Sequence, residues 1–147
     1  MLVGAVSNPF LKPLELNLLR LGQKVASGAR FIQTHAVFDV PAFKAWLEAA
    51  HREGITQRAA ILAGILPLTS TAEAQRLREA HTDHHIPDEV IERLKAAGAD
   101  GAQKEAGLAI CVETIQQLKA LDGLRGIHLL SEGQEALVPQ ILSAAGL

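Results

Sequence analysis

The chain has 147 residues, of which 48% are apolar and 20% are charged, and its formal net charge at pH 7 is −2. This length fits one domain with a real core. The small net charge gives no long-range attraction for nucleic acid or for an anionic membrane, so neither is an expected partner. Because there is one cysteine, no leader pattern and no apolar run long enough to span a bilayer, we expect a soluble, cytoplasmic protein.

The first half of the chain has the pattern of two strand and helix units. Residues 1–9 are a short apolar run closed by turn residues, and residues 13–28 repeat leucines at helical spacing before a glycine. Residues 29–38 form a second apolar strand pattern. The helix pattern over 39–54 follows it, and Asp39 can cap that helix.

The second half continues the same alternation. Residues 58–68 are apolar on both faces, as a strand in a sheet covered by helices requires. The next helix begins at Ser70, which has capping-box spacing to Glu73. The segment AAGADGAQ, before the longest helix, is expected to be a turn. The remaining helix, helix, strand and helix patterns lie in that order at residues 86–98, 103–121, 123–131 and 132–147.

Strands alternating with helices predict parallel pairing through right-handed crossovers. A complete barrel of this type has eight units in about 250 residues, and this chain has four. We therefore expect one α/β domain over residues 1–147, a (β/α)4 half of a TIM-type (β/α)8 barrel. Its outer strands would leave backbone groups unpaired and its inward side chains would face water, so we expect a homo-oligomer, most simply a dimer, unless a first-half chain completes the barrel. Depending on the strand phase, the inward residues include Ile61, Ala63 and Ile65, or Leu2, Gly4 and Val6.

Five segments occur in an order and spacing that resemble the second half of the methylenetetrahydrofolate reductase barrel, and together they cover nearly the whole chain. They are NPF, KVASGARFIQTHAVFD, ILAGILPLTS, IPDEVIERL and GIHLL. The resemblance implies strands five to eight of a flavin-dependent barrel that reduces 5,10-methylenetetrahydrofolate to 5-methyltetrahydrofolate. It also places the family's catalytic glutamate in the other half of the barrel, so it assigns no catalytic residue to this chain.

Polar residues at the strand ends are the candidate ligand groups, because barrels of this type bind ligands at the carboxyl ends of their strands. Thr34 and His35 are therefore expected to face the substrate at the barrel mouth. By resemblance, His35 stands where the family usually has a glutamine that hydrogen-bonds the pterin. A histidine cannot present the adjacent donor and acceptor of an amide. Either the pterin contact is rearranged or folate is not the ligand, and the alternative is a histidine that is satisfied locally. The other strand-end candidates are Ser7, Asn8, Thr69, Ser70, Ser131 and Glu132.

Two further substrate positions and four cofactor positions follow from the same resemblance. Glu73 and Leu77 stand where the family has a glutamine and a phenylalanine that grip folate, although a helix cap and a core leucine are the structural alternatives. The positions that match flavin contacts imply FAD, bound weakly or not at all by the isolated chain; they are Asn8, Asn17, Arg20 and Lys24. The structural alternatives are a turn residue for Asn8 and a solvated lysine near a helix end for Lys24.

Three other features have simpler explanations. His81 and His85 have the i, i+4 spacing of a metal site, but no third ligand is signalled beyond the nearby Asp83, so we assign no metal. Cys111 lies on an apolar helix stripe and is expected to be buried. His128 lies in mid-strand and is expected to be hydrogen-bonded rather than catalytic.

Three functions remain open from the sequence. The favoured one is the carboxyl-terminal half of a folate-linked flavin reductase that is active only with a first-half chain. The second is a self-associating half-barrel that acts as a binding or assembly module without catalysis. The third is a barrel completed by two copies of the chain, with unrelated small-molecule chemistry.

Overall fold

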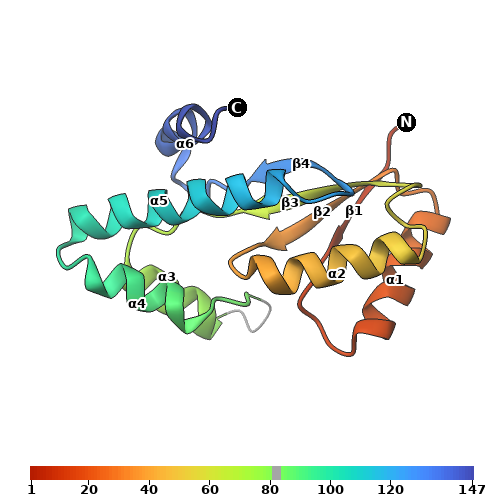
Figure 1. Cartoon of the computed structure of the whole chain (residues 1–147), viewed down its shortest axis with the longest axis horizontal. Coiled ribbons are helices and arrows are strands. Elements are labelled where there is room, and N and C mark those ends of the chain that lie inside the picture. Colours follow the sequence, from red (N-terminus) through yellow and green to blue (C-terminus); the bar gives the residue numbers. More distant parts are fainter. Residues whose placement is uncertain (81–83) are drawn as a thin grey trace.

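The computed structural model describes residues 1–80 and 84–147 and contains one four-stranded sheet (Figure 1). The strands pair in parallel and lie in chain order across the sheet. This order confirms the expected half-barrel topology, in which each strand pairs with the next one along the chain. The strands are β1 (Gly4–Ser7), β2 (Phe31–Ala36), β3 (Ala60–Ile65) and β4 (Leu124–Leu129).

Helices follow each strand, and one pair of helices is inserted after β3. Figure 1 shows α3 and α4 beyond the carboxyl ends of the strands, while α2 and α5 run along the sheet. Within the part of the chain that the structure describes, no helix is long and apolar enough to cross a membrane. The helices are α1 (Leu14–Ala26), α2 (Val40–Arg52), α3 (Thr71–Ala80), α4 (Asp88–Ala96), α5 (Asp100–Lys119), the 3-10 turn η1 (Glu135–Leu137) and α6 (Val138–Ala145).

The helix starts follow the capping residues that the sequence predicts, with one correction. Asp39 Oδ1 accepts a hydrogen bond from Ala42 N at 2.9 Å, and Ser70 Oγ accepts one from Glu73 N at 3.1 Å. The segment AAGADGAQ is only partly a turn, because α5 already begins at residue 100. Gly98 adopts a left-handed φ of 84° directly after the C-cap of α4. This conformation turns the chain sharply, so a short connection is enough to reach α5.

The main core lies between the sheet and the helices along it. Alternate strand residues point into this core, among them Ile32, Ile61 and Ile65, and they meet Phe43 and Trp46 of α2. The buried stripe predicted on the longest helix is confirmed for Cys111, Ile115 and Leu118, while Leu108 is partly buried. A second cluster under α3 and α4 joins the end of β2 to these helices; it includes Ala36, Leu66, Leu77, Ile86, Val90 and Leu94.

Among the described residues, the helices of the main core pack on one face of the sheet, and the opposite face is more open. Val6 of β1 is 54% exposed, and its register partner Gln33 on β2 is half-buried. The structure therefore shows which strand residues face the helices and which face the inside of the half-barrel, a choice that the sequence leaves open. Ile61, Ala63 and Ile65 pack under the helices, and Val6 lies on the open inner face.

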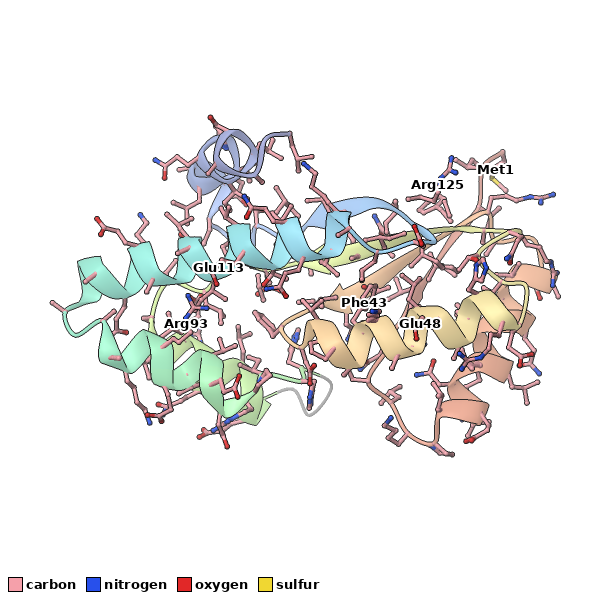
Figure 2. All side chains as sticks on the ribbon, in the orientation of Figure 1. Met1, Phe43, Glu48, Arg93, Glu113 and Arg125 are labelled. Atoms are coloured by element: carbon pink, nitrogen blue, oxygen red, sulfur yellow. The ribbon has the colours of Figure 1, made fainter. Side chains whose placement is uncertain are left out.

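Helices α4 and α5 are joined by a bidentate ion pair. Arg93 Nη1 and Nη2 donate to the two carboxylate oxygens of Glu113 at 2.8 and 3.0 Å (Figure 2). This hydrogen bonding holds the pKa of Glu113 below its ordinary value. The pair is a half-exposed surface link between α4 and α5.

Candidate functional site at the carboxyl edge of the sheet

The carboxyl edge of β2 contains a bulge at the first pair of predicted ligand residues. Gln33 pairs with Leu62, but the next aligned pair is Ala36 with Gly64, so Thr34 and His35 together oppose one β3 residue. Thr34 is buried, and its hydroxyl accepts a hydrogen bond from Gly64 N at 3.0 Å and donates to His35 O at 2.9 Å. The Thr34 side chain thus holds the bulge.

His35 differs from Thr34 in its surroundings. Its side chain is half-buried, and its ring centroid lies 6.2 Å from that of His84, which comes from the connection between α3 and α4. His35 therefore lies at the carboxyl edge of the sheet, the edge at which a barrel of this type binds its ligand.

The four predicted cofactor residues gather around one concavity of about 140 Å3 between the end of β1 and α1. Three cations line it, Lys12, Arg20 and Lys24, and no carboxylate is among the described residues that do so. Lys24 Nζ donates to Val6 O at 2.6 Å, which brings its ammonium to the carboxyl end of β1. This arrangement makes an electropositive recess next to the open face.

The two asparagines of this group also have structural roles. Asn17 Nδ2 donates to Asn8 O at 2.7 Å and to Leu11 O at 3.1 Å, and Asn17 Oδ1 accepts from Trp46 Nε1 at 3.4 Å. Asn8 Oδ1 accepts from Phe10 N at 3.0 Å, as in an Asx turn. Together the asparagines shape the loop after β1, whereas Arg20 and Lys24 are exposed.

Glu73 and Leu77 on α3 are engaged within the protein. Glu73 Oε2 accepts hydrogen bonds from Thr69 N at 2.7 Å and from Thr69 Oγ1 at 2.8 Å. The carboxylate therefore reaches one residue further back than the backbone N–H of Ser70, which a regular capping box would use. Leu77 packs in the second hydrophobic cluster. Both side chains hold α3 at the carboxyl edge.

A histidine and carboxylate pair that the sequence did not predict joins three connections at the same edge. His85 Nε2 lies 3.0 Å from Asp39 Oδ2, and the His85 ring stacks on Phe10 with centroids 5.2 Å apart. The other residues of the suggested metal motif, His81 and Asp83, lie outside the described residues. Among the residues that are described, no group of three His, Cys, Asp or Glu side chains is placed to hold a metal ion.

Cys111 and His128 have the structural surroundings that the sequence predicts. Burial raises the pKa of the Cys111 thiol to about 11, so this side chain is a poor nucleophile. His128 Nε2 lies 2.9 Å from Thr34 O, which confirms that this histidine is hydrogen-bonded.

Comparisons with known proteins agree with this architecture. The family model described as methylenetetrahydrofolate reductase matches residues 6–146. The chain belongs to the methylenetetrahydrofolate reductase family.

Individual members of the methylenetetrahydrofolate reductase family also match almost the whole chain, at identities of 25% and 28%. A protein of Caenorhabditis elegans named "Probable methylenetetrahydrofolate reductase (NADPH)" is 25% identical over 143 residues, which are 97% of this chain and 21% of the relative. Methylenetetrahydrofolate reductase 1 of Schizosaccharomyces pombe is 28% identical over 135 residues, covering 91% of this chain and 22% of the relative. The chain thus spans about a fifth of the length of these relatives.

A solved structure with the same fold supports the half-barrel description. It is an uncharacterized protein from Clostridium thermocellum that binds two copies of 5-methyl-5,6,7,8-tetrahydrofolic acid. It aligns with a TM-score of 0.71 at 18% identity, over 99% of this chain and 52% of that protein. At this identity the likeness shows the fold, and the chain corresponds to about half of it.

Proposed function

We propose that this chain supplies the second four units of a methylenetetrahydrofolate reductase barrel. The completed barrel then uses a bound flavin to reduce 5,10-methylenetetrahydrofolate to 5-methyltetrahydrofolate. The observation that carries the proposal is the open inner face of a parallel sheet whose family match runs from residue 6 to residue 146. The first four units come either from the same polypeptide or from another chain.

The distribution of exposed apolar side chains supports completion by further strand and helix units. These side chains gather on residues 1–3, on β1, on α1 and on the loop between β1 and α1, where a preceding unit would add a strand beside β1 and a helix beside α1. Covering several hundred Å² of such surface is worth on the order of 10 kcal/mol at ~25 cal/mol per Å². The exposed residues at this edge are Met1, Leu2, Val3, Val6, Leu11, Leu16 and Leu19.

The recess beside β1 fits part of the cofactor that the family implies. Its volume of about 140 Å3 suits a phosphate group better than a flavin ring, and its cations suit negative charge. Arg20 and Lys24 would hold the phosphates of FAD, while Asn8 and Asn17 would keep the recess open by shaping the loop. When bound, FAD supplies the hydride-transfer chemistry.

The carboxyl edge of β2 fits a folate-type ligand through His35. The imidazole can donate one hydrogen bond and accept another, which allows a rearranged contact with the pterin. Thr34 would act by holding the bulge, and Glu73 and Leu77 by holding α3 beside the site. That the Clostridium thermocellum protein of this fold binds 5-methyltetrahydrofolic acid favours this ligand class.

Co-expression of the chain with the first four units of a family barrel tests the proposal. We expect a complex that retains flavin and whose reduced flavin is reoxidised anaerobically by 5,10-methylenetetrahydrofolate. The double variant Arg20→Gln, Lys24→Gln should lose flavin, whereas the control Arg58→Gln, on a surface away from the recess, should keep it. A stable complex that binds neither flavin nor folate would overturn the proposal, as would a chain that binds folate only as its own homodimer.

A further inference from the structure

The β2 bulge is connected to both β3 and β4, and its geometry depends on a glycine. A Cβ atom on Gly64 would lie 2.4 Å from Thr34 O and 2.9 Å from His35 O, both of which are backbone atoms. The Thr34 and His35 carbonyls therefore occupy space that any other residue at position 64 would fill. This close approach allows the Thr34 hydroxyl to reach Gly64 N at 3.0 Å.

His128 reaches the same bulge from the far side of β3. It is the register partner of Gly64 on β4, and its Nε2 lies 2.9 Å from Thr34 O on β2. The contact crosses the strand between them at the one position that has no side chain. Because a carbonyl oxygen only accepts, Nε2 must carry the proton, and in the neutral ring Nδ1 then holds the lone pair.

Three strands therefore fix the two peptide groups on either side of the His35 Cα atom. Gly64 N donates to the Thr34 hydroxyl, that hydroxyl donates to His35 O, and His128 donates to Thr34 O. These two peptide groups hold the His35 Cα atom at the carboxyl edge of the sheet. Neither Thr34 nor His128 needs to contact a ligand for this effect.

We propose that His128 is a positioning residue, which acts through the Thr34 carbonyl to orient the His35 imidazole at the ligand site. The assignment of a ligand to His35 rests on the proposed function. The orientation of His35 by His128 is a property of the free chain and does not depend on that assignment. The residue that sets the orientation of the His35 ring, His128 on β4, thus lies two strands away from His35 on β2.

Nuclear magnetic resonance of the full chain labelled with 15N-histidine tests the orientation directly. The chain has 6 histidines, and His35→Asn identifies the signals of His35. We expect His128 to show the Nε2–H tautomer. His128→Leu, which removes the donor, should shift or broaden the His35 ring signals. His128→Gln, whose amide N–H has a similar reach, should restore them, and the shorter His128→Asn should not.

Two controls separate positioning from a general loss of stability. Ile115→Val removes one methyl group from the core without touching the bulge, so it should lower the melting temperature and leave the His35 signals unchanged. If His128→Leu does not fold, His128→Gln can still be compared with His128→Asn. Both carry the same amide donor, and the comparison tests whether a side chain long enough to reach Thr34 O is needed. His35 signals that are unchanged in every folded His128 variant would overturn the proposal.

Ligand affinity provides the second readout in the completed barrel. His128→Leu and His128→Asn should weaken the binding of 5-methyltetrahydrofolate by about five- to tenfold, the scale of one net hydrogen bond, while His128→Gln stays within about twofold of wild type. Equal affinities in all three variants would contradict the positioning role. Absence of binding in the wild-type complex would instead contradict the proposed function, and the 15N signals would still decide the role of His128.

Discussion

Replacing Gly64 by alanine tests the bulge on which the candidate site depends. The new methyl group would lie 2.4 Å from Thr34 O and 2.9 Å from His35 O, and neither oxygen can move without moving the backbone of β2. Overpacking of this kind costs about 1–3 kcal/mol, and loss of the hydrogen bond from Gly64 N to Thr34 adds about 0.5–1.5 kcal/mol. We therefore expect Gly64→Ala to lower the free energy of unfolding by about 2–4 kcal/mol, measured by urea denaturation.

Gly22→Ala is the matched control for this experiment. Gly22 lies inside α1, and a Cβ atom there would meet no heavy atom within 4 Å. The same substitution should stabilise the chain by about 0.5–1 kcal/mol, because alanine is the better helix former. If Gly64→Ala changes the free energy of unfolding by less than about 0.5 kcal/mol, the close approach of β3 to the bulge is wrong.

Three other predictions concern single side chains. His35→Ala should change the free energy of unfolding by no more than about 0.5 kcal/mol, because the side chain is only half-buried, yet weaken pterin binding in a completed barrel; a large fall in melting temperature with unchanged affinity would contradict this. Cys111, whose pKa burial raises to about 11, should react with thiol reagents only as fast as the native chain opens, and rapid modification near neutral pH would show that it is accessible. Arg93 lowers the pKa of Glu113 from its ordinary value of 4.5, so the pair stabilises the fold above that value and the stabilisation is lost as the pH falls through the lowered pKa. The side chains of Arg93 and Glu113 are about half exposed, at 51% and 49%. Glu113→Gln should therefore lower the free energy of unfolding by at most about 0.5 kcal/mol at neutral pH and not at all in strong acid. A loss of stability that grows as the pH falls would contradict this pH dependence.

The alternation of strands and helices could be predicted from the sequence because the local signals agree with one another. Asp39 and Ser70 belong to the residue types that favour the N-cap position, and in the structure each accepts a capping hydrogen bond at the start of a helix. The sequence does not indicate the early start of α5, because a glycine alone does not show how tightly the chain turns. The strand phase was also left open, since an apolar residue such as Val6 satisfies either face of a buried strand.

The sequence places candidate ligand residues at the carboxyl edge of the sheet, but it does not give the hydrogen bonds that connect them. Strand ends point to the carboxyl edge, so Thr34 and His35 could be found from the sequence. The bulge could not, although Gly64 within an apolar strand is a signal of close backbone approach. The pairing of His85 with Asp39 joins residues 46 positions apart, and only the fold brings them together.

The mass of the purified chain, measured by light scattering during size exclusion, tests the half-barrel most directly. Val6 and the apolar residues of the β1 and α1 edge are exposed in one copy, and β1 and β4 each have one unpaired edge. We expect a colourless species heavier than one chain, which becomes an equimolar, flavin-binding complex when the first four units are supplied. A compact species with the mass of one chain, cooperative in melting and indifferent to the first four units, would contradict it.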